Sequence, residues 1–99
     1  MFVMVSRFHV RPGEEDAFLA LHEDVERRRQ SRIEGLISRE LLADLEDEST
    51  FVALARYTSR EAAESHFRDP DYGDWYQRLV SLSNEAPDVA LYRMAWQTE

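Results

Sequence analysis

The chain has no cysteine and only three glycines among its 99 residues. Without cysteine there is no disulfide, no thiolate ligand for a metal and no cysteine nucleophile. Three glycines cannot build a glycine-rich phosphate loop, a nucleophile elbow or a dinucleotide-binding fingerprint. The sequence therefore gives no support for a flavin, nicotinamide or nucleotide site.

Long apolar runs and basic surfaces are also missing. No stretch approaches the ~18 apolar residues needed to cross a bilayer, and the first residues lack the basic and apolar regions of a signal peptide. The formal net charge of −8 argues against nucleic acid as a partner. The basic run at residues 27–29 lies in a glutamate-rich segment, where ion pairs along a helix are the favoured interpretation. We therefore expect a cytoplasmic protein that binds neither membranes nor nucleic acid.

The length of 99 residues fits a single domain that spans residues 1–99. A chain this short buries only about 60–70% of the surface that its unfolded form exposes. Pairing with a second copy would add stability, so oligomerisation is a reasonable expectation.

The spacing of apolar residues predicts four strands and two helical regions. The strands are expected at residues 2–10, 36–43, 50–58 and 89–97, and the helices at residues 14 to about 32, 60–67 and 72–83, the last two separated by Asp69-Pro70-Asp71. Ser59 is a plausible N-cap. The order is the ferredoxin-like βαββαβ arrangement of an α+β protein, with helices on one face of a four-stranded antiparallel sheet.

Strand side chains alternate between two faces, which assigns them to two sets. To the helix-covered face we assign Phe2, Met4, Ser6, Phe8, Leu36, Ser38, Glu40, Leu42, Phe51, Ala53, Ala55, Tyr57, Ala90, Tyr92, Met94 and Trp96. To the opposite face we assign Val3, Val5, Arg7, Ile37, Arg39, Leu41, Val52, Leu54, Arg56, Val89, Leu91 and Arg93. Both sets are substantially apolar, so a second sheet is expected to cover the open face in a homodimer.

Small residues on the helix-covered face suggest a pocket between sheet and helices. The small residues that leave volume are Ala53, Ala55, Ser6 and Ser38, and the aromatic residues that would frame it are Phe2, Phe8, Tyr92 and Trp96. The alternative is that Phe18 and Leu21 of the first helix fill this space, since cores also alternate large and small side chains.

Three residues are candidates for proton transfer in such a pocket. Glu40 is predicted to point toward the helices, where burial would raise the pKa of its carboxyl; the alternative is a pairing with a helix cation. His22 and His66 lie on inward helix faces, where a neutral imidazole suits proton transfer but is also a common hydrogen-bonded core residue. The histidine spacing shows no metal-binding pair, so no metal site is expected.

Other aromatic and basic residues leave two interpretations open. One aromatic cluster, in the last helical region, is expected to form a lid or a wall of the pocket, or else to be part of the core; it consists of Tyr72, Trp75 and Tyr76. The strand arginines, assigned to the dimer-facing side, are either salt-bridged at the strand ends or bind an anion; they are Arg7, Arg39, Arg56 and Arg93.

Several short segments resemble the antibiotic biosynthesis monooxygenase family of the dimeric α+β barrel superfamily. They are residues 11–13 (Arg-Pro-Gly), 34–36 (Glu-Gly-Leu, where the family usually has Pro-Gly and a bulky residue), 53–59, 59–67 and 69–72. The resemblance covers nearly the whole chain and implies two sheets packed back to back, with a cleft between each sheet and its own helices.

The resemblance also implies a function. Similar proteins oxidise polycyclic phenols and quinols without metal or flavin: a base deprotonates the substrate, whose anion reduces dioxygen directly. His66 occupies a position where the family commonly has histidine. The leading hypothesis is a cofactor-independent monooxygenase for a small aromatic phenol or quinol, with His66, Tyr72, Glu40 and His22 handling protons; the expected substrate contacts are Ser6, Phe8, Ala53, Tyr76, Tyr92 and Trp96.

Two alternatives remain beside the leading hypothesis. One is a non-catalytic dimeric module that binds a small ligand, since fold does not determine function. The other is heme degradation, which a branch of the family performs with an asparagine, a tryptophan and an axial histidine. At or near those positions this sequence has Ser6, His66 and Tyr76, a departure that argues against the heme scheme.

Overall fold

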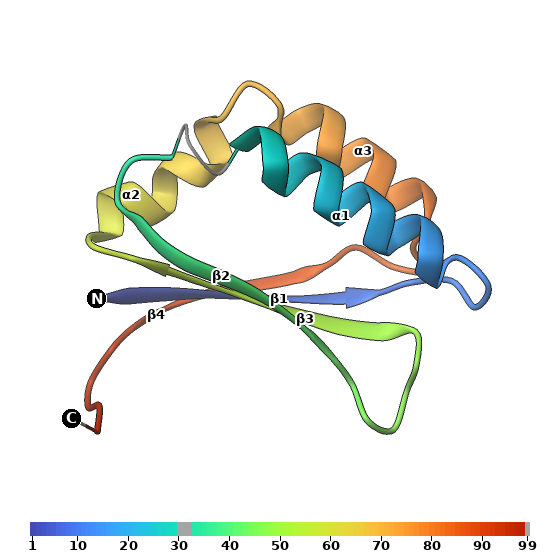
Figure 1. Cartoon of the computed structure of the whole chain (residues 1–99), viewed down its shortest axis with the longest axis horizontal. Coiled ribbons are helices and arrows are strands. Elements are labelled where there is room, and N and C mark those ends of the chain that lie inside the picture. Colours follow the sequence, from blue (N-terminus) through green and yellow to red (C-terminus); the bar gives the residue numbers. More distant parts are fainter. Residues whose placement is uncertain (30–32, 99) are drawn as a thin grey trace.

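The chain folds into one antiparallel sheet with helices on one side. The computed structural model describes residues 1–29 and 33–98. The elements are β1 (Phe2–His9), α1 (Glu15–Arg29), β2 (Leu36–Ala43), β3 (Thr50–Tyr57), α2 (Arg60–Glu64), the 3-10 helix η1 (Ser65–Arg68), α3 (Tyr72–Ser81) and β4 (Asp88–Arg93). The strand order is β2-β3-β1-β4, and all helices lie on the same face (Figure 1). The predicted α+β, ferredoxin-like fold is confirmed.

Helix α1 forms where the spacing of apolar residues predicts it. Phe18, Leu21 and Val25 are buried against the sheet, and two carboxylates, Glu15 and Asp16, occupy the first turn, where the helix dipole favours anions. On the outer face Arg27 and Arg28 pair with acidic residues one turn earlier, as expected for a solvated face. The helix end predicted near residue 32 lies outside the described residues.

The second helical region is shorter and more broken than its sequence pattern predicts. Ser59 caps α2 by accepting a hydrogen bond from the Ala62 amide at 3.0 Å, as expected. After five residues the chain continues as η1, which places His66 on the buried side. Gly35, with φ of +84°, lies so close to α2 that a Cβ would meet the Ala62 Cβ at 2.7 Å. Glycine is therefore required where the chain enters β2.

The buried core consists of two clusters. The larger contains Phe8, Val10, Phe18, Leu21, Val25, Phe51, Ala53 and Leu79. The smaller contains Met4, Ala55, Tyr57 and Ala63. Polar side chains interrupt the helix-covered face between these clusters, and the cavity described below lies there.

A register shift in β2 changes which residues face the helices. Leu36 pairs with Tyr57 and Ser38 pairs with Arg56, so Ile37 is an extra residue, a β-bulge, in this edge strand. The side chains that follow are turned to the face opposite to the one predicted. Arg39 and Leu41, opposite Ala55 and Ala53, therefore face the helices, and Ser38, Glu40 and Leu42 face away.

The predicted faces of β4 are also wrong. Val89, Leu91 and Arg93 pair with Ser6, Met4 and Phe2 and so share the helix-covered side. Tyr92 lies on the open face with 57% of its surface exposed, and Trp96, beyond the strand, is 79% exposed. Alternation could not assign the phase of β4, because both of its sides carry apolar residues. The strand also ends at Arg93 rather than at residue 97.

The other face of the sheet carries no helix among the described residues (Figure 1). Its side chains, placed by the strand register, include Val3, Val5, Val52, Leu54, Leu42 and Tyr92. No helix in the described part of the chain is long and apolar enough to span a membrane.

Candidate functional site

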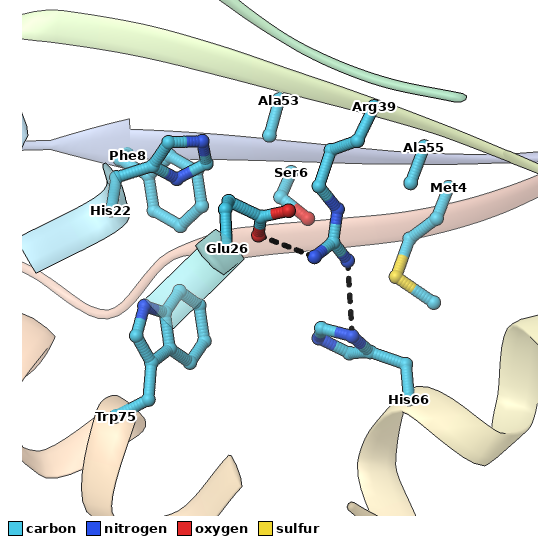
Figure 2. Close-up of a pocket in the computed structure, with 10 residues that line it drawn as sticks. All are labelled: Met4, Ser6, Phe8, His22, Glu26, Arg39, Ala53, Ala55, His66 and Trp75. Atoms are coloured by element: carbon cyan, nitrogen blue, oxygen red, sulfur yellow. Dashed lines mark hydrogen bonds and ion pairs between the residues drawn. The ribbon is translucent and has the colours of Figure 1, made fainter. Parts of the chain in front are cut away.

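A small cavity lies between the sheet and the helices, where the two core clusters meet. Its volume is about 30 Å³, enough for a water molecule. Side chains from β1, β2, β3, α1, η1 and α3 line it (Figure 2): Met4, Ser6, Phe8, His22, Glu26, Arg39, Ala53, Ala55, His66 and Trp75. The two alanines and the serine leave the sheet floor open, and larger side chains from the helices form the opposite wall.

Arg39 is the central polar group of this cavity. Its Nη1 donates to Glu26 Oε1 at 2.5 Å, and its Nη2 lies 3.3 Å from the Tyr57 hydroxyl and 3.2 Å from His66 Nδ1. Only 11% of the Arg39 side chain is exposed. The β2 bulge positions this arginine, because the guanidinium would otherwise project from the open face.

His66 is buried and meets the cavity through a defined ring nitrogen. A guanidinium can only donate hydrogen bonds, so Nδ1 accepts from Arg39, and a neutral ring then carries its proton on Nε2. Figure 2 shows this second nitrogen pointing away from Arg39, on the side where Trp75 lies. Tyr72 packs edge-on against the ring at 5.3 Å between centroids and helps to fix its orientation.

His22 enters the cavity from α1, one turn before Glu26. Burial lowers the pKa of its imidazole, and the nearby Arg39 charge lowers it further, against an opposing effect of Glu26. The ring stacks on that of Phe18, with 6.3 Å between centroids and an angle of 30° between the ring planes. At neutral pH His22 is therefore uncharged and can accept a proton.

A second cavity, of about 210 Å³, lies at the edge of the sheet beside β2. It is lined by Leu36, Ile37 and Ser38, together with His22, Glu26 and Arg39, which also line the inner cavity. The Glu26–Arg39 pair is therefore part of the wall that the two cavities share.

The structure brings together five of the predicted site residues. They line the inner cavity and are His22, His66, Ser6, Phe8 and Ala53. The predicted alternative, filling by helix side chains, holds in part: Phe18 packs against Phe8 and Phe51 and occupies the space on one side.

The other predicted residues lie elsewhere. Glu40 projects from the open face and pairs with Arg56, because the bulge reverses its side. Tyr92 and Trp96 are exposed for the reasons given above. Tyr72 and Tyr76 stack on each other behind His66 and Trp75 and do not line the cavity.

Sequence reasoning missed two charged residues of the cavity. Arg39 was placed on the wrong face, and a bulge in an edge strand leaves no mark in the alternation of Leu36 to Ala43. Glu26 was detectable, because it follows His22 by four residues and so shares its helix face. Trp75, considered as a lid or wall, is a wall of the cavity.

Within residues 1–29 and 33–98, no group of three or more histidine, aspartate or glutamate side chains could hold a metal ion. The cavity instead offers two imidazoles, one guanidinium with its carboxylate, and aromatic rings. Such a set can remove a proton from an acidic hydroxyl group and stabilise the resulting anion.

The fold and the cavity define a ferredoxin-like α+β protein with an aromatic-walled site between sheet and helices. The family model of the antibiotic biosynthesis monooxygenases matches residues 1–78. The chain belongs to this family. No curated protein sequence matches it significantly.

Solved structures with the same fold cover almost the whole chain. SnoaB from Streptomyces nogalater, described as a cofactor-independent oxygenase, has a TM-score of 0.84 at 21% identity, covering 97% of this chain and 94% of that one. Rv0793 from Mycobacterium tuberculosis has a TM-score of 0.85 at 21% identity, covering 99% and 98%. A conserved protein from Methanosarcina mazei has a TM-score of 0.83 at 17% identity, covering 93% and 90%. At these identities the likeness shows the shared fold.

Proposed function

We propose that the protein is a cofactor-independent monooxygenase that oxidises a small aromatic phenol or quinol with dioxygen. The observation that carries the proposal is the pair of imidazoles, His22 from α1 and His66 from η1, in one aromatic-walled cavity of a chain that belongs to this family. The description of SnoaB as a cofactor-independent oxygenase supports the same reaction class.

His22 is the proposed general base. Its lowered pKa keeps the imidazole neutral, so it can take the proton of the phenol. The phenolate is stabilised by the donors opposite, Arg39 and the Nε2–H of His66, which act strongly in a site shielded from water. Tyr72 keeps the His66 ring in place and does not touch substrate.

The reaction needs no external reductant. The phenolate transfers one electron to dioxygen, and the resulting superoxide combines with the substrate radical at a ring carbon to give a hydroperoxide. Cleavage of the O–O bond, with loss of the hydrogen on that carbon, leaves a carbonyl and releases water. The phenol thus supplies all four electrons: one oxygen atom enters the quinone product and the other leaves as water, with His22 returning its proton.

We also propose that the active form is a homodimer. The helix-free face carries a band of apolar side chains from all four strands, and Tyr92 and Leu42 on it are largely exposed in the single chain. A contiguous patch of this kind is unfavourable in water, and a second sheet would cover it. Light scattering on the purified protein should give twice the mass of one chain; a monomer at micromolar concentration would contradict this proposal.

The test is oxygen uptake by the pure protein, without added metal or flavin, on a panel of hydroquinones, naphthols and anthrones. Heat-denatured protein is the control, and mass spectrometry with ¹⁸O₂ should find one labelled oxygen in the product. Replacing His22→Asn should lower the rate by about 10²-fold or more. The matched control is His9→Asn, on β1 outside the cavity beside Glu85 and Asp88, which should leave the rate unchanged.

Either of two results would overturn the proposal. Uptake no greater than with denatured protein across the panel would favour the non-catalytic binding module. A full rate in His22→Asn would remove His22 as the base, and His66→Ala would then be the next variant to measure.

A further inference from the structure

Arg39 is a permanent cation beside the cavity, where stabilising a phenolate requires a hydrogen-bond donor but not a full charge. It projects from the sheet beside Ala55 on the helix-covered side, and its partner Glu26 comes from α1. The other two acceptors that it meets among the described residues are neutral, the Tyr57 hydroxyl and His66 Nδ1, both beyond 3.1 Å. The single charged acceptor is therefore the Glu26 carboxylate.

Glu26 is held less firmly than Arg39. Its side chain is 24% exposed, and it borders the outer cavity as well as the inner one. Rotation of this side chain would move the carboxylate into water, where its solvation is recovered. The guanidinium cannot follow, because β2 and the buried Tyr57 hydroxyl and His66 ring hold it in place.

The cavity volumes show why this rotation matters. The inner cavity, at about 30 Å³, is far smaller than the ~150 Å³ that admits a benzene ring. The outer cavity, at about 210 Å³, exceeds that volume and shares the Glu26–Arg39 wall. Rotation of Glu26 out of this wall would open the inner cavity toward the outer one, with the guanidinium between them.

We propose that the ligand of this site is a hydroxyaromatic carboxylate, whose carboxylate replaces Glu26 on Arg39 while its ring enters the space between the two cavities. In the empty site the Glu26 carboxylate occupies the position on Arg39 that the carboxylate of the ligand would take. This inference rests on the proposed function, since it narrows the phenol to one that carries an acidic group. The arginine fork matches the planar carboxylate and distinguishes it from a neutral phenol.

The overall charge of the chain gives the arginine a further role. A net charge of −8 repels anions at long range, so an acidic ligand binds only where a cation is exposed locally. The exchange keeps the local charge balanced, because one carboxylate leaves the guanidinium as another arrives. Among the described residues that line the two cavities, Arg39 is the cation on which selectivity for the acid depends.

Calorimetric titration of the full chain at pH 7.5 with 1-hydroxy-2-naphthoate and 1-naphthol tests the proposal, because the two probes differ by one carboxylate. The wild type should bind the naphthoate at least tenfold more tightly. Arg39→Gln should remove this preference. Glu26→Gln, which retains Arg39 and weakens its competitor, should tighten naphthoate binding several-fold and leave naphthol binding unchanged. Arg56→Gln, on the opposite face, should keep the wild-type preference.

Three results would overturn the inference: equal affinity of the two probes, including no binding of either; an unchanged preference in Arg39→Gln; or weaker naphthoate binding in Glu26→Gln. The last variant leaves the inference testable if Arg39→Gln does not fold. Oxygen uptake separates the two proposals. If neutral phenols are oxidised as fast as their carboxylate derivatives, only this inference is overturned. If the naphthoate binds tightly but no phenol causes oxygen uptake, only the proposed oxygenase activity is overturned.

Discussion

The two faces of the sheet each carry an arginine–glutamate pair, and the pairs differ mainly in their surroundings. On the covered face Arg39 and Glu26 are 11% and 24% exposed and border two cavities. On the open face Arg56 and Glu40 are 31% and 50% exposed and pair across neighbouring strands. In the single chain the same chemistry thus gives a candidate ligand site on one face and a solvated surface pair on the other.

The comparison indicates that burial, rather than residue type, decides how much an ion pair contributes to stability and ligand binding. In a shielded site a charge interacts strongly with its partners, and its loss leaves the partner unsatisfied. On an exposed face water and salt screen the pair and replace lost contacts. A substitution on the covered face should therefore lower the free energy of unfolding more than a matched substitution on the open face. The difference should be largest for apolar side chains and smaller for charged ones.

The largest difference is expected between two apolar residues of similar size. Met4→Ala, on the covered face, removes a buried side chain and should lower the free energy of unfolding by about 2–5 kcal/mol. Leu54→Ala, on the open face, should cost about 1 kcal/mol at low chain concentration, where the chain is single and this position is partly buried, and more where the proposed homodimer covers it. Urea unfolding at low and high chain concentration measures both. A loss in Leu54→Ala equal to that in Met4→Ala would contradict an uncovered face and support the dimer.

The two arginines should show a smaller difference. Arg39→Met leaves Glu26 and His66 without their donor and should lower the free energy of unfolding by about 2 kcal/mol, between the values for exposed and buried pairs. Arg56→Met should cost less than about 1 kcal/mol. The measurement is again urea unfolding, at pH 7.5 and low salt. If both variants lose the same stability, burial does not distinguish the pairs.

The smallest effect concerns pH and the buried His22. The folded pKa of His22 is lowered by burial, so the unfolded chain takes up a proton at higher pH than the folded one. This contribution to stability is fully present above the unfolded pKa near 6.5 and is lost as pH falls from there through the lowered folded pKa. It amounts to at most ~1.4 kcal/mol between pH 6.5 and 5.5, because one pKa unit corresponds to that value.

His22→Asn should therefore make the free energy of unfolding less sensitive to pH over this interval than it is in the wild type. Thermal unfolding in steps of half a pH unit measures both. Identical slopes in wild type and His22→Asn would show that the imidazole is not buried in the neutral form, and would also weaken its assignment as the base.

Most of the fold could be predicted from the sequence, because its determinants are local. The spacing of Phe18, Leu21 and Val25 predicts α1, and the Ser59 cap predicts the start of α2. The candidate site was predictable where it depends on β1, β3 and the helices, which supply Ser6, Ala53, His22 and His66.

The part that depends on β2 and β4 was not predictable. The face of Arg39 is decided by how an edge strand pairs with β3, and a pattern with apolar residues on both sides fits either phase. The ends of β4 and the broken α2–η1 segment depend on tertiary contacts for the same reason. The volume of the pocket was also not predictable. The sequence indicated a pocket, but its inner part holds little more than a water molecule, because that volume depends on how the side chains pack.

The bulge at Ile37 determines the sign of the charge that the site presents. If the pairing of Leu36 with Tyr57 continued without the bulge, Ser38 would lie opposite Ala55 and Glu40 opposite Ala53. Arg39 would then project from the open face. A site selective for anions would then become one selective for cations without any substitution. For protein engineers who want to invert the selectivity of this scaffold, the backbone of one edge strand is thus a more direct target than the walls of the cavity.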